Sequence, residues 1–253
     1  MRSSNPILRG KTFQSQATAT AGEPMTVNGT IARTGLLLVL ALITGSWTWH
    51  HFMLAFASGG AQAAMAAVSP YMWGGFIVGL VLALVTVFKP TWAAISAPLY
   101  AIAEGTALGA ISALYNVQYH GIVLQALLAS VGVLVLMLVL YRAGVIKVTN
   151  KFRTGVIAAT GGIFLLYLVE WGLSAFTSYN IPFINGSGAL GIGFSVLVVG
   201  LAALNLVLDF DLIERATEQR APKYMEWYCA FALMVTLVWL YMELLRLLAK
   251  TRR

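Results

Sequence analysis

Seven runs of apolar residues, each long enough to cross a bilayer, dominate the sequence. They lie at about 34–56, 71–88, 91–115, 121–141, 154–176, 188–210 and 226–248. A membrane helix needs about 20 mostly apolar residues, because the hydrocarbon core is about 30 Å thick. A helix also satisfies its own backbone polar groups, which lipid cannot do. The sequence therefore predicts an all-α membrane protein, a bundle of seven transmembrane helices.

Composition and charge agree with a membrane protein. Of the 253 residues, 59% are hydrophobic and 10% are charged, and the mean hydropathy is +0.82. A soluble domain carries about 25% charged residues. Residues 1–30 are polar and contain no apolar core, so they are predicted to be a disordered cytoplasmic tail and not a cleaved signal peptide. Residues 31–253 are predicted to form the transmembrane domain.

Basic residues are distributed unevenly between the ends of the runs. The loops after the first, third and fifth runs contain no Lys or Arg, whereas twelve flank the other side: Arg2, Arg9, Lys11, Arg33, Lys89, Arg142, Lys147, Lys151, Arg153, Arg215, Arg220 and Lys223. Cytoplasmic loops carry the excess of Lys and Arg, so the N-terminus is predicted to be cytoplasmic. The net charge of +7 is thus assigned to lipid headgroups, and no nucleic-acid partner is expected.

The basic C-terminus conflicts with this orientation. Seven full crossings place Arg246, Lys250, Arg252 and Arg253 outside the cell. The alternative is that the last run re-enters the membrane and returns the tail to the cytoplasm. Seven crossings are favoured, because misplacing one short tail costs less than misplacing whole loops.

Four carboxylates lie inside the apolar runs: Glu104, Glu170, Asp209 and Glu243. An ionised group in hydrocarbon costs roughly 3 kcal/mol on insertion scales, so such residues normally face a bundle interior or an aqueous path. Their positions predict a series by depth, with Asp209 inner, Glu104 central, and Glu170 and Glu243 outer. A series of this kind is what a cation or proton path requires.

Structural roles for the same residues remain open. Glu104 is either a helix-linking protonated carboxyl or an ion ligand. Asp209 is either a solvated helix end or a gate acid; Asp211, two residues later, points to a different side of a helix. Asn205 lies one turn before Asp209 on the same face and is predicted to share a ligand or water with it.

The two outer acids differ in their local surroundings. Arg246 lies three residues after Glu243, so a local ion pair accounts for that acid as well as an ion path does. Glu170 has no such charged neighbour, and Tyr167 lies three residues before it. Glycines at helix-packing spacing, Gly75 with Gly79 and Gly105 with Gly109, predict close helix contacts instead of a binding site.

Several function classes lack their signatures. No Lys lies in the middle of a run, which excludes a retinal Schiff base, and there is no HExxH sequence or defensible Ser–His arrangement. Enzyme activity and a cofactor are therefore not expected, and no metal ligand set is assigned. The single cysteine, Cys229, excludes an internal disulfide.

Four short segments carry a family resemblance. They are Glu-Gly-Thr-Ala-Leu-Gly-Ala-Ile-Ser at 104–112, Leu-Asp-Phe-Asp-Leu-Ile-Glu-Arg-Ala at 208–216, Leu-Tyr-Met-Glu-Leu-Leu-Arg-Leu-Leu at 240–248, and the opening Met-Arg-Ser-Ser-Asn-Pro. Together they resemble the Bax inhibitor (transmembrane Bax inhibitor motif, YccA-like) family, and the opening resembles a bacterial branch of it. The resemblance implies a seven-helix bundle in a bacterial inner membrane, with the last helix near the centre.

The resemblance also implies a function and a sensor. Family members are associated with a pH-sensitive leak of calcium, sensed by two Asp residues that share a proton. Asp209 matches the first Asp, and aligning 244–248 puts Thr236 at the second. A rival alignment puts Glu243 there, at a depth too far from Asp209 to share a proton. The chain is thus expected to lack a simple Asp–Asp latch.

Two function hypotheses follow. The leading one is a pH-sensitive leak channel or transporter for Ca²⁺ or H⁺, with Asp209 as the cytoplasmic gate acid and Glu104 as the mid-path ligand. The alternative is a non-conducting membrane regulator that binds a partner such as a membrane protease.

Overall fold

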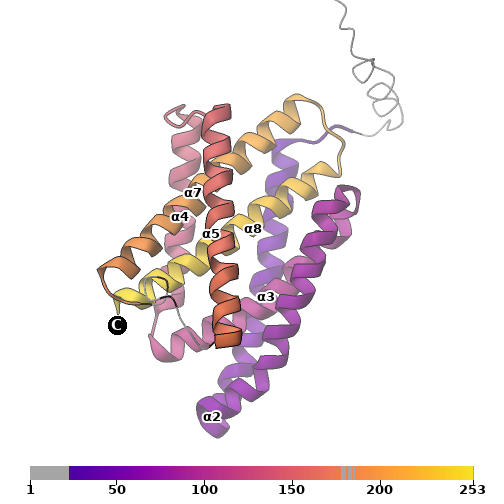
Figure 1. Ribbon diagram of the computed structural model, residues 1–253. Helices are drawn as coiled ribbons and strands as arrows, with labels where there is room; N and C mark the ends of the chain where they lie inside the picture. The colour runs from indigo at the N-terminus through magenta and orange to yellow at the C-terminus, as the bar shows by residue number, and fades with distance from the viewer. Residues whose placement is uncertain (1–22, 178–180, 182–183, 185, 253) are drawn as a thin grey trace, which may run out of the picture.

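The computed structural model describes residues 23–177, 181, 184 and 186–252. Within them the structure is helical and contains no strand (Figure 1). The six long helices are α2 (Val27–Phe88), α3 (Ala93–Gln118), α4 (Ile122–Arg142), α5 (Asn150–Thr177), α7 (Ala189–Glu218) and α8 (Met225–Thr251), and the 3-10 helix η2 (Pro90–Trp92) precedes α3. Helices long and apolar enough to cross a membrane number six in this part of the chain. An all-α membrane protein is confirmed.

The predicted count of seven helices is not matched, because α2 takes up both of the first two apolar runs. Residues 57–69 are rich in alanine, a strong helix former, so the helix continues where a loop was predicted, and Pro70 lies inside it. Its 62 residues would measure about 93 Å if straight. Gly60, at φ 70°, interrupts the helical geometry, which glycine permits because it has no Cβ.

The bend at Gly60 divides α2 into a first arm (27–59) and a second arm (61–88) that lie side by side. Trp47 of the first arm packs edge-on against Tyr71 of the second, with 5.2 Å between ring centroids. Phe52 and Val68 share one buried cluster. The second arm ends at Phe88, immediately before Lys89-Pro90, as the sequence predicted.

Glycines bring α3 close to both arms. A Cβ on Gly105 would overlap the backbone of Ala41, and one on Gly109 would overlap the backbone of Gly45. On the other side, a Cβ on Gly75 would overlap the carbonyl of Ala103. The predicted role of these glycines in helix packing is confirmed.

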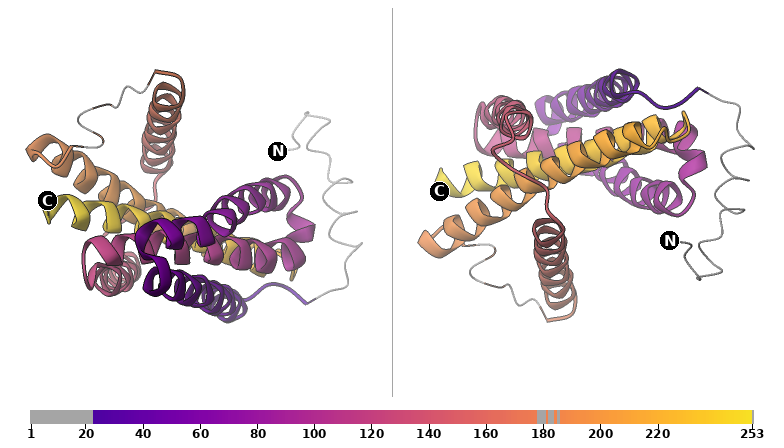
Figure 2. Two further views of the ribbon diagram at one scale, coloured as in Figure 1. Left: turned by 90° about the horizontal axis from the view of Figure 1, so that it is seen from below. Right: turned by 90° about the horizontal axis from the view of Figure 1, so that it is seen from above.

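Helix α8 lies at the centre of the bundle. It packs against α2, α3, α4 and α7 (Figure 2). Its buried residues are distributed around the helix. Helix α5 lies at the periphery, where α7 is its main backbone neighbour. The expectation that the last helix occupies the centre agrees with this arrangement.

The two ends of the bundle are distinct. At one end, which we call the N-terminal end, the Met25 amide donates to Ala221 O (2.8 Å) in the α7–α8 turn. At the opposite, C-terminal end, Arg252 donates to His120 O (2.9 Å) in the α3–α4 turn. Helix α8 runs without interruption between them, so the re-entrant alternative for the last run is wrong.

The last residues of the predicted tail, 23–30, are folded. Residues 1–22 lie outside the described residues, but 27–30 already form the first turn of α2. The Thr26 hydroxyl accepts from the Gly29 amide (2.9 Å) and caps that turn. Residues 23–26 pack against the α7–α8 turn, so part of the predicted disordered tail belongs to the folded structure.

Candidate functional site

Asp209 lies deeper in the bundle than the sequence predicted. The apolar run ends near 210, but α7 continues to Glu218 because the charged residues after Asp209 are also good helix formers. Nine further residues place Asp209 about 13 Å from the end of α7, at 1.5 Å per residue. Asp209 therefore lies within α7, at its interface with α8, and not at the end of a helix.

The side chain of Asp209 lies against α8. The Thr236 hydroxyl lies beside its carboxyl and donates to Ala232 O (3.2 Å), and the Cys229 thiol lies close to the same carboxyl. Oδ2 of Asp209 is buried and accepts no hydrogen bond within the described structure. No ion pair of Asp209 is present there either. The α7–α8 interface thus holds one carboxyl with a hydroxyl and a thiol beside it.

Asp211 has the opposite surroundings, although it is only two residues away. Arg153 of α5 donates to its Oδ2 (2.5 Å), and Arg215 donates to its Oδ1 (3.0 Å). The prediction that the two aspartates point to different sides is confirmed. With both oxygens held by guanidinium groups, Asp211 ties α5 to α7.

Asn205 is turned toward α5. Its amide donates to Thr160 Oγ1 (2.8 Å) and to Leu201 O (2.9 Å). Asn205 was predicted to share a ligand or water with Asp209. In the described structure no hydrogen bond joins the two side chains.

Glu243 is the centre of a second polar cluster, formed with Tyr167, Glu170 and Arg246. Its Oε1 accepts from the Tyr167 hydroxyl (3.0 Å) and from Arg246 (3.2 Å), whose guanidinium stacks 4.9 Å from the Tyr167 ring centroid. Oε2 is buried and accepts no hydrogen bond within the part of the chain described. The local Glu243–Arg246 pair is confirmed, and Tyr167 connects it to α5.

Glu170 belongs to this Glu243 cluster. Its charge acts on both Tyr167 and Arg246, so the carboxylate without a local partner in the sequence lies near a cation from another helix. Two carboxylates therefore share one guanidinium in this cluster.

One face of α8 connects the two acidic sites. Thr236, beside Asp209, and Glu243 are seven residues apart, which is about two turns or roughly 10 Å along the axis. Leu240, fully buried, lies between them on that face. The structure thus brings Asp209 and Glu243 to the same side of the central helix.

Glu104 lies on another side of α8. Its carboxylate sits against Gly79 of the second arm of α2. Tyr100, one turn earlier on α3, packs on Phe231 of α8 at 5.0 Å between ring centroids. Phe231 is five residues before Thr236, about 140° around the helix. The four acids consequently lie in three separate places, since Glu170 and Glu243 share one cluster, and they do not form one stack.

A cavity of about 300 Å³ opens between the first arm of α2, α3, α4 and α8. Its lining is apolar apart from serines and Tyr241, whose hydroxyl is 2.6 Å from Ser112 Oγ. None of the four intramembrane acids lines this cavity. Within the described residues, no group of three His, Cys, Asp or Glu side chains is close enough to hold a metal ion.

Comparison with protein families decides the classification. The model of the family described as "Bax inhibitor 1 like" matches residues 5–253, almost the entire chain. The chain belongs to the Bax inhibitor 1-like family. Searches of the curated proteins and of the solved structures returned no match.

Membership of the Bax inhibitor 1-like family explains why the residue beside Asp209, Thr236, is of interest. The resemblance assigned a second Asp to this sensor, and the alignment on 244–248 placed Thr236 at that position. Thr236 is the α8 residue whose hydroxyl interacts with Asp209, whereas Glu243 lies two turns away. In this Bax inhibitor 1-like chain, a hydroxyl stands beside Asp209 where the alignment places the second acid.

The burial of two charged residues of α8 was not predicted from the sequence. Glu226, with 0% of its surface exposed, pairs with Arg33 at the N-terminal end. Lys250, 5% exposed, donates to Ile184 O (2.6 Å), Gly191 O (3.0 Å) and Ser195 Oγ (2.8 Å) at the C-terminal end. Both residues lie at the edges of the last apolar run, where charged residues usually face solvent. Their burial follows from the central position of α8.

Proposed function

We propose that this Bax inhibitor 1-like protein is a pH-sensitive cation leak in a bacterial inner membrane, with a cytoplasmic N-terminus and no enzymatic role. Each arm of α2 is long enough to cross the bilayer, which gives seven crossings from six helices. Basic residues support the orientation, since Arg33, Arg153, Arg215 and Lys223 gather near the N-terminal end. The basic residues of α8 at the other end bind neighbouring groups, which reduces their conflict with this orientation.

The observation that carries the proposal is the buried Asp209 oxygen that has no hydrogen-bond partner in the described structure. An ionised carboxyl in such a place costs several kcal/mol, and a bound proton or cation removes that cost. The Thr236 hydroxyl, which donates to Ala232 O (3.2 Å), can accept a hydrogen bond from the protonated carboxyl beside it. Asp209 is thus suited to take up and release an ion.

The donor set favours a proton over Ca²⁺ at Asp209. Ca²⁺ binds roughly six to eight oxygen ligands. The side chains beside Asp209 supply one carboxyl and one hydroxyl, and the nearby Cys229 offers sulfur. A proton needs a single oxygen, so we assign H⁺ as the ion that binds here and treat Ca²⁺ as a second permeant ion to be measured.

The proposed route follows the face of α8 that carries Thr236 and Glu243. The Tyr167 hydroxyl donates to Glu243 and can exchange protons with it, and Arg246 forms an ion pair with the same carboxylate. Leu240 separates Asp209 from Glu243, so conduction requires its displacement or the entry of water. Glu104 lies off this route and serves as the matched control.

The test is flux in proteoliposomes that contain a pH-sensitive or a Ca²⁺-sensitive dye. We expect a wild-type H⁺ leak that varies with pH, loss of it in Asp209→Asn, and little change in Glu104→Gln. Absence of flux in the wild type, or equal flux in Asp209→Asn, would contradict the proposal. Co-purification of a membrane protease with a wild type that conducts nothing would instead favour the non-conducting regulator.

A further inference from the structure

Four residues that precede α2 lie across the turn between α7 and α8. We call this segment, residues 23–26, the strap. The Met25 amide donates to Ala221 O (2.8 Å), and Pro24 pairs with Pro222 in an isolated bridge. The Met25 side chain is 2% exposed and belongs to the buried cluster that contains Cys229. The strap is therefore docked on the N-terminal end of the bundle by backbone bonds and by an apolar side chain.

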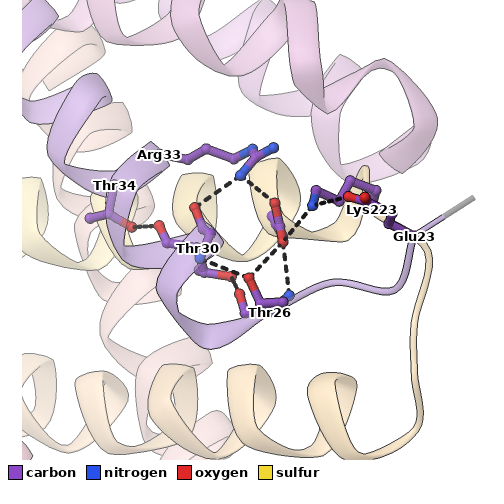
Figure 3. Close-up of polar contacts among 8 residues, drawn as sticks. Glu23, Thr26, Thr30, Arg33, Thr34 and Lys223 are labelled. Carbon is purple, nitrogen blue, oxygen red and sulfur yellow. Dashed lines mark hydrogen bonds and ion pairs between the residues drawn. The ribbon is translucent and has the colours of Figure 1, made fainter.

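The carboxylate of Glu226 attaches the strap to the central helix. Its Oε1 accepts from the Thr26 amide (2.8 Å) and the Thr26 hydroxyl (3.1 Å), and its Oε2 forms an ion pair with Arg33 of α2. Figure 3 labels Thr26 and Arg33, which point toward this carboxylate. A Cβ on Gly29 would overlap the Glu226 carboxyl, so the first turn of α2 closes directly over it. One buried acid thus joins the strap, α2 and α8.

A second, exposed attachment lies beside it. Lys223 Nζ is 2.9 Å from Glu23 Oε2 and 3.9 Å from Glu226 Oε1. The Lys223 ammonium lowers the pKa of Glu23 through a hydrogen bond and its charge. Exposed pairs of this kind contribute little to stability. The Glu226 contacts, which are shielded from water, therefore hold most of the strap.

The docked strap lies one helical turn from the Asp209 site. Glu226 and Cys229 are three residues apart on α8, so they share one side of the helix. Cys229, 1% exposed, senses the Asp209 charge and lies in the same buried cluster as Met25. The strap and its Glu226 contacts thus cover the end of the α7–α8 interface nearest to Asp209.

We propose that the strap is a gate over this interface, held shut by Glu226 and opened when residues 23–26 undock. Opening admits water from the N-terminal side to Cys229 and Asp209. The effect of opening on ion flux rests on the function proposed above. The opening itself can be measured without any flux.

Cys229 provides the readout, because it is the single cysteine of the chain. The full-length protein in proteoliposomes is treated with a charged, membrane-impermeant methanethiosulfonate, and labelling is followed by intact mass. We expect slow labelling in the wild type and a rate at least about tenfold higher in Glu226→Gln, because breaking a buried ion pair strongly favours local opening. Reagent on the N-terminal side alone should produce this increase. Cys229→Ala should give no labelling.

Two further variants keep the test decisive. Met25→Ala removes the apolar anchor and leaves Glu226 with both cations, so it carries the test should Glu226→Gln fail to fold. Glu218→Gln, an exposed acid at the same end of the bundle, is the matched control and should label like the wild type. Folding is verified by a monodisperse gel-filtration peak.

The outcomes separate the gate from the leak. Unchanged labelling in folded Glu226→Gln and Met25→Ala, or an equal increase in Glu218→Gln, would overturn the gate. Faster labelling in a protein that conducts no ion would support the gate and contradict the leak. Flux that needs Asp209, with labelling unaffected by either strap variant, would support the leak and reduce the strap to a structural contact.

Discussion

Asp209 and Glu226 both place a carboxyl inside the half of the bundle near the N-terminal end. Glu226 is fully buried and Asp209 is partly buried, and their partners differ. Glu226 has two cations and two Thr26 donors around it. Asp209 has one hydroxyl and one thiol beside it and forms no ion pair in the described structure. Its buried Oδ2 therefore has neither a donor nor a cation, whereas Glu226 Oε2 faces the Arg33 guanidinium. Burial alone therefore does not distinguish an acid that holds the fold from one that is available to an ion.

The partners of the two acids make that distinction. A paired buried acid leaves its cations uncompensated when it is removed, which destabilises the fold. Replacing an unpaired acid by a neutral residue removes a desolvation cost and breaks no ion pair. The free energy of unfolding therefore stays the same or rises. The two sites should respond to the same chemical change with opposite effects on stability and on function.

The largest expected effect is on stability, and it is confined to one site. Glu226→Gln should lower the free energy of unfolding by about 3 kcal/mol, because Arg33 and Lys223 lose their shared carboxylate. Asp209→Asn, as the matched control, should unfold at or above the wild-type temperature. Thermal unfolding in detergent, followed by loss of the gel-filtration peak, measures both. An equal drop in the two variants would remove the contrast between the sites.

The next prediction adds a second acid beside Asp209. Thr236→Asp should create a close carboxyl pair that shares one proton and titrates as a unit. The pH profile of H⁺ flux should then gain a step that the wild type lacks. Thr236→Val, which removes the hydroxyl without adding charge, is the control and should give no new step. A Thr236→Asp profile that overlays the wild type would show that position 236 does not communicate with Asp209.

A smaller effect is expected at the Glu243 cluster. Glu243→Gln removes the carboxylate that holds Arg246 and Tyr167, so H⁺ flux should fall several-fold without being abolished, because Glu170 still lies near Arg246. Glu104→Gln, at the α2–α3 interface, should conduct like the wild type. The same liposome assay compares them. A larger loss in Glu104→Gln than in Glu243→Gln would move the route to the other side of α8.

Much of the fold could be predicted from apolar length, and the errors have local causes. The runs locate the helices, and Lys89-Pro90 ends α2 as expected. The count failed because alanine-rich residues 57–69 continue the helix through the predicted loop. Asp209 was expected near the end of its helix, but α7 extends eight residues beyond Phe210, through charged helix formers. Apolar length marks the part of a helix inside lipid but not where the helix ends.

The site could be predicted only in part. The contact between Asp209 and Thr236 followed from the family alignment, and the Glu243–Arg246 pair followed from helical spacing. The contacts of Glu226 with Thr26, and of Glu170 with Arg246, join helices that are far apart in the sequence. Spacing along one chain segment cannot show such contacts, because they depend on how α8 is enclosed by the other helices.

The smallest expected effect is at Glu23, the exposed counterpart of Glu226. Lys223 lowers the pKa of Glu23, so this pair stabilises the docked strap above the unfolded pKa and stops doing so as the pH falls through the folded value. Both carboxyls share Lys223, yet Glu23 is solvated, so Glu23→Gln should leave the unfolding temperature and the Cys229 labelling rate at neutral pH close to wild type. A labelling increase in Glu23→Gln that matches Glu226→Gln would mean that the exposed pair, and not the buried acid, holds the strap.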